Sequence, residues 1–155
     1  MKPILLLDLD GVLITTPSWK ADQIHEDGYS AFNKTAVENL NELLANTNAD
    51  IWLSSTRRMN KSLEEFNTIF SNRRIERKLA GFVPHGTLSE SRLEEINAFL
   101  DLKPGQKFII IDDDNSLQDL TEERKKYWIK TNAMIGFDKE KLQEAIRLVN
   151  DLKLF

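Results

Sequence analysis

The sequence contains no cysteine, which excludes a disulfide framework, a thiolate metal site and a cysteine nucleophile. It contains only two histidines, His25 and His85, so a zinc site built from several histidines is excluded as well. No apolar run approaches the roughly 18 residues that a membrane span requires. The first apolar stretch, Ile4–Leu7, is too short for the core of a secretion signal. We therefore expect a soluble, cytoplasmic protein without a membrane partner.

What remains is the composition of an ordinary globular domain. The chain has 155 residues, of which 41% are hydrophobic and 30% are charged, and this excludes an intrinsically disordered protein. Its formal net charge is −4, so any contact with nucleic acid needs a local basic patch. We find no repeat, low-complexity tract or linker, and we expect one domain over residues 1–155.

Short apolar segments alternate along the chain with segments of helical period. The predicted strands are Ile4–Leu9, Asp50–Ser54, Ala80–Val83, Lys107–Ile111 and Trp128–Lys130. Between them, apolar residues recur at helical spacings in four groups: Val37, Leu40 and Leu44; Met59, Leu63, Phe66 and Phe70; Leu93, Ile96 and Leu100; Leu142, Ile146, Val149 and Leu152. This alternation predicts an α/β fold, a three-layer Rossmann-like parallel sheet of about five strands flanked by helices.

Local signals refine this prediction. Ser91–Glu94 matches a capping box at the start of the third predicted helix, and Asp138 is a plausible N-cap for the last one. The segment 14–32 is too long for an ordinary connection between a strand and a helix. We expect it to form a flap over the carboxyl edge of the sheet rather than a domain.

Carboxylates follow two of the predicted strands. The first strand runs into Asp8 and Asp10, and the fourth runs into Asp112, Asp113 and Asp114. If these strands are neighbours, the carboxylates converge, and two unit charges 4 Å apart interact by roughly 4 kcal/mol near a protein surface. Such a cluster needs a cation. Oxygen ligands without histidine or cysteine select a hard ion, and Mg²⁺ fits best because it shares its shell with water and phosphate.

The spacing within the first motif suggests a division of labour. In an extended strand Asp8 and Asp10 would point the same way, and Gly11 permits the sharp turn that lets both approach a ligand. One carboxylate could attack a phosphoryl group while the other transfers protons.

Hydroxyl and cationic side chains could complete a phosphate site. Ser54 and Ser55 follow the second strand, where hydroxyl groups and backbone N–H groups suit a phosphate oxygen, although Ser55 and Thr56 fit a helix cap equally well. Arg92 lies in the first turn of a predicted helix, where the helix dipole disfavours a cation unless an anion is near. We therefore consider Arg92 a candidate for neutralising phosphoryl charge.

Other polar residues favour structural interpretations. Asp114 is better placed as an N-cap than as a ligand. His85 lies at the expected active-site edge and could contact substrate, but its position fits a plain loop residue better. Trp19 and His25, in the expected flap, are candidates to line its entrance. The basic run 73–78, with Arg57 and Arg58 before it, is typical of a solvated face, and contact with nucleic acid is the alternative.

Three motifs resemble those of the haloacid dehalogenase (HAD) superfamily. DLDGV at Asp8–Val12 is similar to its first motif, DxDG[TV]; Ser54, directly after IWL, resembles the second; and IIIDDD at Ile109–Asp114 resembles the fourth. The resemblance covers essentially the whole chain, and the spacing leaves no room for a large cap. Five segments also resemble, more loosely, the small HAD domains found alone and in bacterial RNA-repair assemblies: FNKTAVENLNELL, IWLSSTR, SRLEEINAFL, IIIDDD and WIKTNAMIGF.

This resemblance implies roles for individual residues. Asp8 would be the nucleophile that forms an aspartyl-phosphate, with Mg²⁺ bridging its carboxylate and the phosphoryl group. Asp10 would protonate the leaving group and then activate water, and its backbone carbonyl would bind the metal. Ser54 would hydrogen-bond a phosphoryl oxygen. Asp112 would bind Mg²⁺ directly, and Asp113 directly or through water.

The third motif of the superfamily departs from the pattern here. It is normally a lysine, whereas its best positional match in this chain is Arg92, with Lys103 and Lys107 less well placed. Arginine keeps the charge but differs in reach and geometry.

The sequence thus predicts a Mg²⁺-dependent phosphomonoesterase. Without a cap the site would be open, which favours a bulky phosphorylated substrate such as a nucleic-acid end or a phosphoprotein, although the flap could suffice for a small phosphoester. No obligate partner is evident. One alternative is an inactive HAD-like binding domain. Another is a receiver-like module, which carries its acceptor on a central strand, whereas the third strand here ends in Pro84–Gly86. A nicotinamide-binding domain is disfavoured because no GxGxxG follows the first strand.

Overall fold

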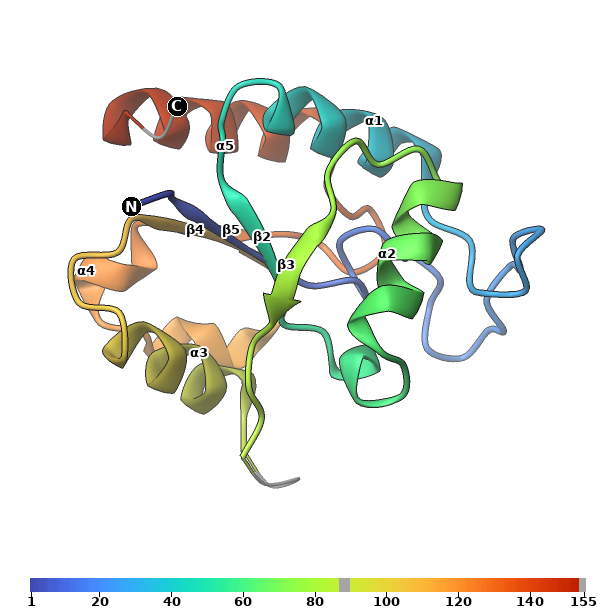
Figure 1. Cartoon of the computed structure of the whole chain (residues 1–155), viewed down its shortest axis with the longest axis horizontal. Helices are drawn as coiled ribbons and strands as arrows, with labels where there is room; N and C mark the ends of the chain where they lie inside the picture. The colour runs from blue at the N-terminus through green and yellow to red at the C-terminus, as the bar shows by residue number, and fades with distance from the viewer. Residues whose placement is uncertain (87–89, 154–155) are drawn as a thin grey trace.

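A five-stranded parallel sheet forms the centre of the molecule (Figure 1). The structure is a computed structural model that describes residues 1–86 and 90–153. The strands lie in the order β3-β2-β1-β4-β5. They are β1 (Ile4–Leu7), β2 (Asp50–Leu53), β3 (Leu79–Phe82), β4 (Phe108–Asp112) and β5 (Trp128–Lys130). The predicted three-layer α/β fold without a large cap is therefore confirmed.

Helices cover both faces of this sheet (Figure 1). On one face lie α1 (Lys34–Leu44), α2 (Leu63–Asn72) and α5 (Lys139–Leu152). On the other lie α3 (Arg92–Asp101), the 3-10 turn η2 (Asn115–Asp119) and the short α4 (Glu122–Lys125). A second 3-10 turn, η1 (Thr56–Met59), follows β2. The predicted caps form: Ser91 and Glu94 make a reciprocal capping box, and Asp138 caps α5.

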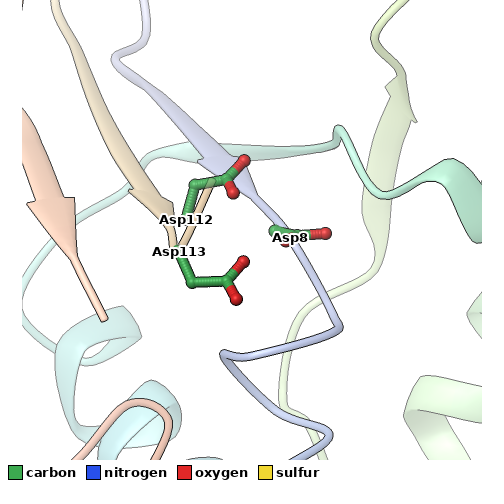
Figure 2. Close-up of side chains that lie close together, drawn as sticks. All are labelled: Asp8, Asp112 and Asp113. Carbon is green, nitrogen blue, oxygen red and sulfur yellow. The ribbon is translucent and has the colours of Figure 1, made fainter. Parts of the chain in front are cut away.

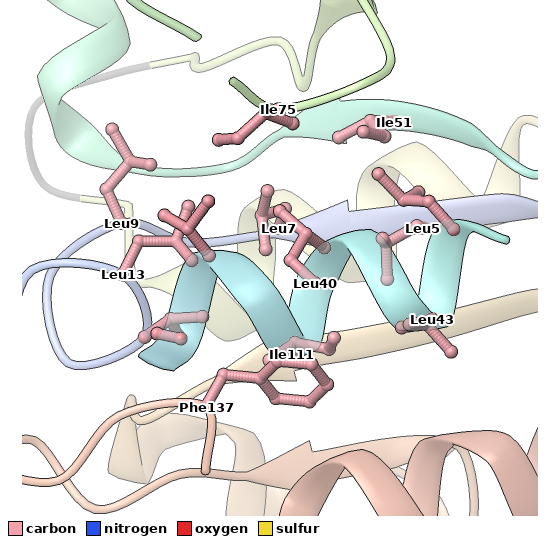
Figure 3. Packing of buried hydrophobic residues seen from close by; sticks show 14 of the residues in the cluster. Leu5, Leu7, Leu9, Leu13, Leu40, Leu43, Ile51, Ile75, Ile111 and Phe137 are labelled. Carbon is pink, nitrogen blue, oxygen red and sulfur yellow. The ribbon is translucent and has the colours of Figure 1, made fainter. Parts of the chain in front are cut away.

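The core has two parts, one on each face of the sheet, because side chains alternate along the strands. Leu5 and Leu7 of β1 pack toward Leu40 of α1 (Figure 3), whereas Ile4 and Leu6 pack with the residues of α3. All four are buried, as expected for a strand covered on both faces.

The direction in which successive strands are added to the sheet changes between β1 and β4. From β1 the chain adds β2 and β3 on one side, and it then returns to add β4 and β5 on the other side. Ligands of open α/β sheets bind outside the carboxyl ends of the strands at such a switch point. The fold therefore predicts a ligand site near the residues that follow β1 and β4.

Three details differ from the predictions. The first strand ends at Leu7 rather than Leu9. Met59 belongs to η1 and is partly exposed, because Ser62 and Glu65 form a capping box that starts α2 after it. The third strand in chain order, β3, lies at an edge of the sheet, and β1 is central. The ending of β3 is therefore no argument against a receiver-like module, but the strand order is, because the flavodoxin-like order that receivers share is 2-1-3-4-5.

Residues 14–32 form turns and a short pairing of Ile24 with Ser30, without a helix. We keep the name flap for this segment. Asn33 follows it and caps α1 with its side chain. That the chain is a single domain with a flap of these bounds remains a prediction.

Candidate active site

Three carboxylates meet where β1 and β4 end. Asp8 follows β1, Asp112 is the last residue of β4, and Asp113 comes next. One oxygen from each carboxylate lies within 4.8 Å of the others, and the three side chains lie close together (Figure 2). Asp8 and Asp112 are buried, and Asp113 is half-buried. We call these residues the carboxylate cluster.

The backbone explains why these side chains converge. β1 and β4 are neighbouring parallel strands, in which Leu7 pairs with Ile111. The backbone N–H of Asp8 donates to the carbonyl oxygen of Ile111 over 3.1 Å. The two strands therefore end side by side, and the residues that follow them face the same space.

A tight turn then carries the chain away from the cluster. The carbonyl oxygen of Leu9 accepts hydrogen bonds from the N–H groups of Val12, Leu13 and Ile14. Gly11 has a φ of +80°, and a Cβ atom there would lie 2.2 Å from Oδ2 of Asp113. Glycine is thus required at this position both for the backbone conformation and for the close approach of Asp113.

Arg92 is the cation of the cluster. It is the first residue of α3, and it is buried. Its Nη1 lies 2.5 Å from Oδ2 of Asp112 and 3.5 Å from Oδ1 of Asp8. Burial opposes its charge, yet the carboxylates of Asp112 and Asp8 raise the pKa of the guanidinium above its ordinary value. Arg92 therefore lies beside anions, as we expect for a cation in the first turn of a helix.

One arginine does not balance three carboxylates. Burial raises the pKa of Asp8 well above its ordinary value, and the charge of Asp112 adds to this. Burial raises the pKa of Asp112 against the opposing effect of Arg92, and burial together with the charge of Asp112 raises that of Asp113. When all three carboxylates are ionised, two negative charges remain uncompensated, and all the donors are oxygens. This donor set fits a hard divalent cation such as Mg²⁺.

Ser54 directly follows the neighbouring strand β2, and its N–H donates to the carbonyl oxygen of Leu7. Its Oγ is buried and has no hydrogen-bond partner among the described residues. Buried hydroxyl groups normally have a partner, so this oxygen is available to a ligand.

Ser55 and Arg58 have structural contacts instead. Ser55 Oγ accepts a hydrogen bond from the N–H of Arg57 and caps η1, which supports the capping interpretation. Arg58 is buried, pairs with Glu95 of α3, and donates to the carbonyl oxygens of Ser54 and Ser55. It therefore fixes the loop that carries Ser54.

Asp10 does not lie where the alternation of a strand would place it. Because β1 ends at Leu7, the side chain of Asp10 is not part of the carboxylate cluster, the only such acidic group among the described residues. It is half exposed and accepts two hydrogen bonds from Arg57, over 2.8 Å and 2.9 Å. The predicted metal contact through its backbone carbonyl is a separate matter and stays a prediction.

Arg57 joins Asp10 to the flap, and the sequence reasoning missed this. Its Nη1 donates to Tyr29 and Ser30, and its Nη2 donates to Asp22 as well as to Asp10. All five N–H donors of the guanidinium are thus used. Arg57 stands three residues after Ser54, and its distance in sequence from the flap left no signal for the pairing.

The basic run 73–78 is not a free solvated face. Arg73 is buried and binds the carboxylate of Asp27 and the backbone carbonyl of Ser30 in the flap. Arg77 donates to the carbonyl oxygens of Leu44 and Ala49. The interpretation as a solvated face is therefore wrong for these two residues, because each satisfies backbone carbonyl groups.

The remaining candidates lie away from the cluster or serve as caps. Asp114 caps η2, as predicted. Lys107 precedes β4 at the opposite edge of the sheet, and Lys103 lies over the rings of Trp52 and Phe99, so neither replaces Arg92. His85 and Trp19 are exposed, and the Nδ1 atom of His25 accepts from the N–H of Asp27.

Comparisons with known proteins agree with this geometry. A family model described as "HAD domain in Swiss Army Knife RNA repair proteins" matches residues 4–142. A search of curated proteins found no significant match. Within the described residues, no helix is both long and apolar enough to cross a membrane.

Proposed function

Because the chain belongs to the family of HAD domains in Swiss Army Knife RNA repair proteins, we propose that it is a Mg²⁺-dependent phosphomonoesterase. The family supports a phosphohydrolase-like function at the level of the superfamily. The observation that carries the finer proposal is the carboxylate cluster with Arg92 against it and the unpartnered Ser54 hydroxyl on the next strand.

Asp8 is the nucleophile in this proposal. An oxygen of its carboxylate attacks the phosphorus of a phosphate monoester, and the bond between phosphorus and the leaving oxygen breaks. Asp10 donates a proton to that oxygen. In the second step Asp10 accepts a proton from water, the water oxygen attacks the phosphorus, and the bond to Asp8 breaks to release inorganic phosphate.

The carboxylate cluster would hold the metal, through Asp8, Asp112 and Asp113. When bound, Mg²⁺ neutralises charge so that an anionic phosphate can approach an anionic nucleophile. Ser54 would donate to a phosphoryl oxygen, because its buried hydroxyl lacks a partner among the described residues. Arg92 keeps Asp112 in place and adds positive charge beside Asp8. Ser55 stays a proposed contact, because its hydroxyl accepts the N–H of Arg57 in capping η1 and still has its own proton to donate.

For the substrate we propose a phosphorylated RNA end. The name of the family points to RNA repair, and the chain carries no large cap that would enclose a small substrate. A small phosphoester or a phosphoprotein is the competing substrate, and the experiment below separates these classes.

The test is a panel of phosphoesters assayed with Mg²⁺ and with EDTA. It contains p-nitrophenyl phosphate, a phosphopeptide, and RNA oligonucleotides phosphorylated at the 5′ or the 3′ end. We expect hydrolysis that requires Mg²⁺, is abolished by Asp8→Asn and is unchanged by Asp119→Asn, an exposed residue of η2 outside the cluster. Equal rates with Mg²⁺ and EDTA, or full activity of Asp8→Asn, would contradict the proposal.

A binding domain without turnover is the second candidate. The observation that favours it is the pairing of Asp10 with Arg57, since both oxygens of this carboxylate already accept hydrogen bonds from the guanidinium. Tight binding of Mg²⁺ and phosphorylated RNA without release of phosphate from any member of the panel would support this alternative.

A further inference from the structure

A hollow of about 520 Å³ opens beside the carboxylate cluster, beyond Asp113. It lies at the carboxyl edge of the sheet, between the start of η2, the end of β5 and the first turn of α5. Its lining residues are Asp113, Asn115, Lys130, Thr131, Asn132, Ala133, Met134 and Lys141. A bound phosphoryl group at the cluster would therefore have this space as a neighbour.

The lining of the hollow is suited to an anion. Lys130 and Lys141 bring two positive charges, and Asn115 and Asn132 bring amide donors. The acidic residue that lines it, Asp113, belongs to the cluster itself. Another hollow, of about 510 Å³, lies at the opposite edge of the sheet, and Asp101 and Glu123 offset its cations.

Lys130 lies next to the carboxylate cluster along the sheet. It is the last residue of β5, and it pairs in register with Asp112 on the adjacent strand. It is exposed, and in the described part of the chain no carboxylate lies within ion-pair distance of it. Its ammonium lies 5.7 Å from the centre of the Trp128 ring.

Lys141 stands on the other side of the hollow, in the first turn of α5. The dipole of a helix disfavours a cation in its first turn. Its partner is Glu144 on the same helix, at 3.0 Å, and both side chains are partly exposed. A surface pair of this kind contributes little stability, so a phosphate can compete for the lysine.

We propose that this hollow binds the phosphodiester next to the terminal phosphate of an oligonucleotide, through Lys130 and Lys141. The inference rests on the proposed phosphatase function and specifies how its substrate is recognised. A terminal phosphate alone would leave both lysines unused, whereas a chain of phosphodiesters presents a second anion beside the first. The exposed side chain of Met134 offers an apolar wall for a sugar or base.

Local charge is needed for such a substrate because the chain as a whole is acidic, with a net charge of −4. The run 73–78 does not supply it beside the cluster, because this run precedes β3 at the amino edge of the parallel sheet. Within the run, Arg73 and Arg77 are also bound to groups of the protein. The two lysines beside the cluster therefore carry the recognition.

The test compares two substrates in the double variant Lys130→Gln/Lys141→Gln. We expect KM for phosphorylated RNA to rise, with kcat/KM for p-nitrophenyl phosphate unchanged. RNA binding is measured by fluorescence anisotropy with labelled oligonucleotide at several salt concentrations. The slope of the logarithm of the binding constant against the logarithm of the salt concentration should be shallower by about 1.4 in the double variant, as expected for two lost phosphate contacts. Between about 50 and 200 mM salt, wild type should lose roughly sevenfold more affinity than the double variant does.

The matched control is Lys139→Gln. Lys139 begins α5 two residues before Lys141, but it pairs with Glu42 and does not line the hollow. It should leave KM and the salt slope unchanged. Three results would overturn the inference: the double variant loses kcat/KM equally on both substrates, Lys139→Gln has the same effect as the double variant, or the double variant loses affinity for the phosphopeptide alone.

The two proposals fail separately in this design. If no phosphoester is hydrolysed, the proposed function fails, and the anisotropy measurement still tests the hollow. If hydrolysis occurs and the lysine variants bind RNA as wild type does, the hollow has no part in recognition.

Discussion

Arg92 and Arg57 both bind carboxylates of the segment after β1, but they do so in different surroundings. The side chain of Arg92 is 7% exposed and lies against Asp8 and Asp112 in the core of the site. The side chain of Arg57 is 23% exposed and connects Asp10 with the flap. Removing one partner from a buried ion cluster is costly, whereas partly exposed ion pairs contribute little. The first arginine therefore balances charge that the fold has buried, and the second fixes geometry.

The largest effect that would test this contrast is expected from Arg92→Met, which leaves Asp8 and Asp112 buried without their cation. In EDTA the free energy of unfolding should fall by about 3–5 kcal/mol, because an uncompensated buried charge remains. Arg92→Lys, which keeps the charge, should retain most of the stability. Urea denaturation of both variants measures this, and Mg²⁺ should restore part of the loss in Arg92→Met. A loss below about 1 kcal/mol in EDTA would show that Arg92 does not balance the cluster.

Gly11→Ala tests the side of the cluster away from Arg92. A non-glycine residue at positive φ costs about 1–2 kcal/mol, and the new methyl group would displace Asp113. The overlap should add about 1–3 kcal/mol and weaken Mg²⁺ binding.

Gly28→Ala in the flap is the control for that variant. Gly28 has a φ of +86° with no atom within 4 Å of the added Cβ, so its cost is that of the backbone alone. Equal losses of stability and equal Mg²⁺ affinities in the two alanine variants, by urea denaturation and calorimetry, would mean that the approach to Asp113 is unimportant.

Arg57→Ala examines the other half of the comparison. We expect a loss of only about 1 kcal/mol in stability, since the pairs are partly exposed. The kcat value should fall more clearly than KM rises, because Asp10 loses the group that orients it. The amide of Ala31, which donates to Gln23 within the flap, should exchange faster with solvent. Arg57→Lys should not rescue kcat, because lysine lacks the planar fork that binds both oxygens of Asp10. Full rescue of kcat by lysine would show that only the positive charge of Arg57 matters.

The smallest effect is expected on lowering the pH, which weakens the contribution of the Asp27–Arg73 pair to the free energy of unfolding. Hydrogen bonds from Arg73 hold the pKa of Asp27 well below its ordinary value. Its contribution to stability is therefore complete above the unfolded pKa of about 3.9 and is lost as the pH falls through the folded pKa. The difference in unfolding free energy between wild type and Asp27→Asn should shrink from about pH 6 to about pH 3. A constant difference over this range would contradict the assignment.

The same comparison separates what the sequence could predict from what it could not. Asp8, Asp112 and Asp113 follow apolar strands, and the geometry of parallel sheets brings such ends together. Arg92 was predicted from a local conflict, a cation in the first turn of a helix. Both features depend only on residues that are neighbours in sequence or in the sheet.

The contacts of the flap had no such signal. Arg57 meets Asp10, Asp22 and Ser30 because an irregular segment folds back over the loop after β2, and no periodicity specifies that path. The same holds for Arg73, which looked like part of a charged run and is buried under the flap. The direction of Asp10 was mispredicted for a related reason, since the turn after Leu7 ends the alternation of the strand.

The most direct test of the central claim is to quench turnover with acid and map the phosphorylated peptide by mass spectrometry. With Mg²⁺ and a hydrolysed phosphoester, we expect a phosphoryl group on the peptide that contains Asp8, and none in Asp8→Asn. A phosphoryl group on another residue, or hydrolysis that persists in Asp8→Asn, would contradict it.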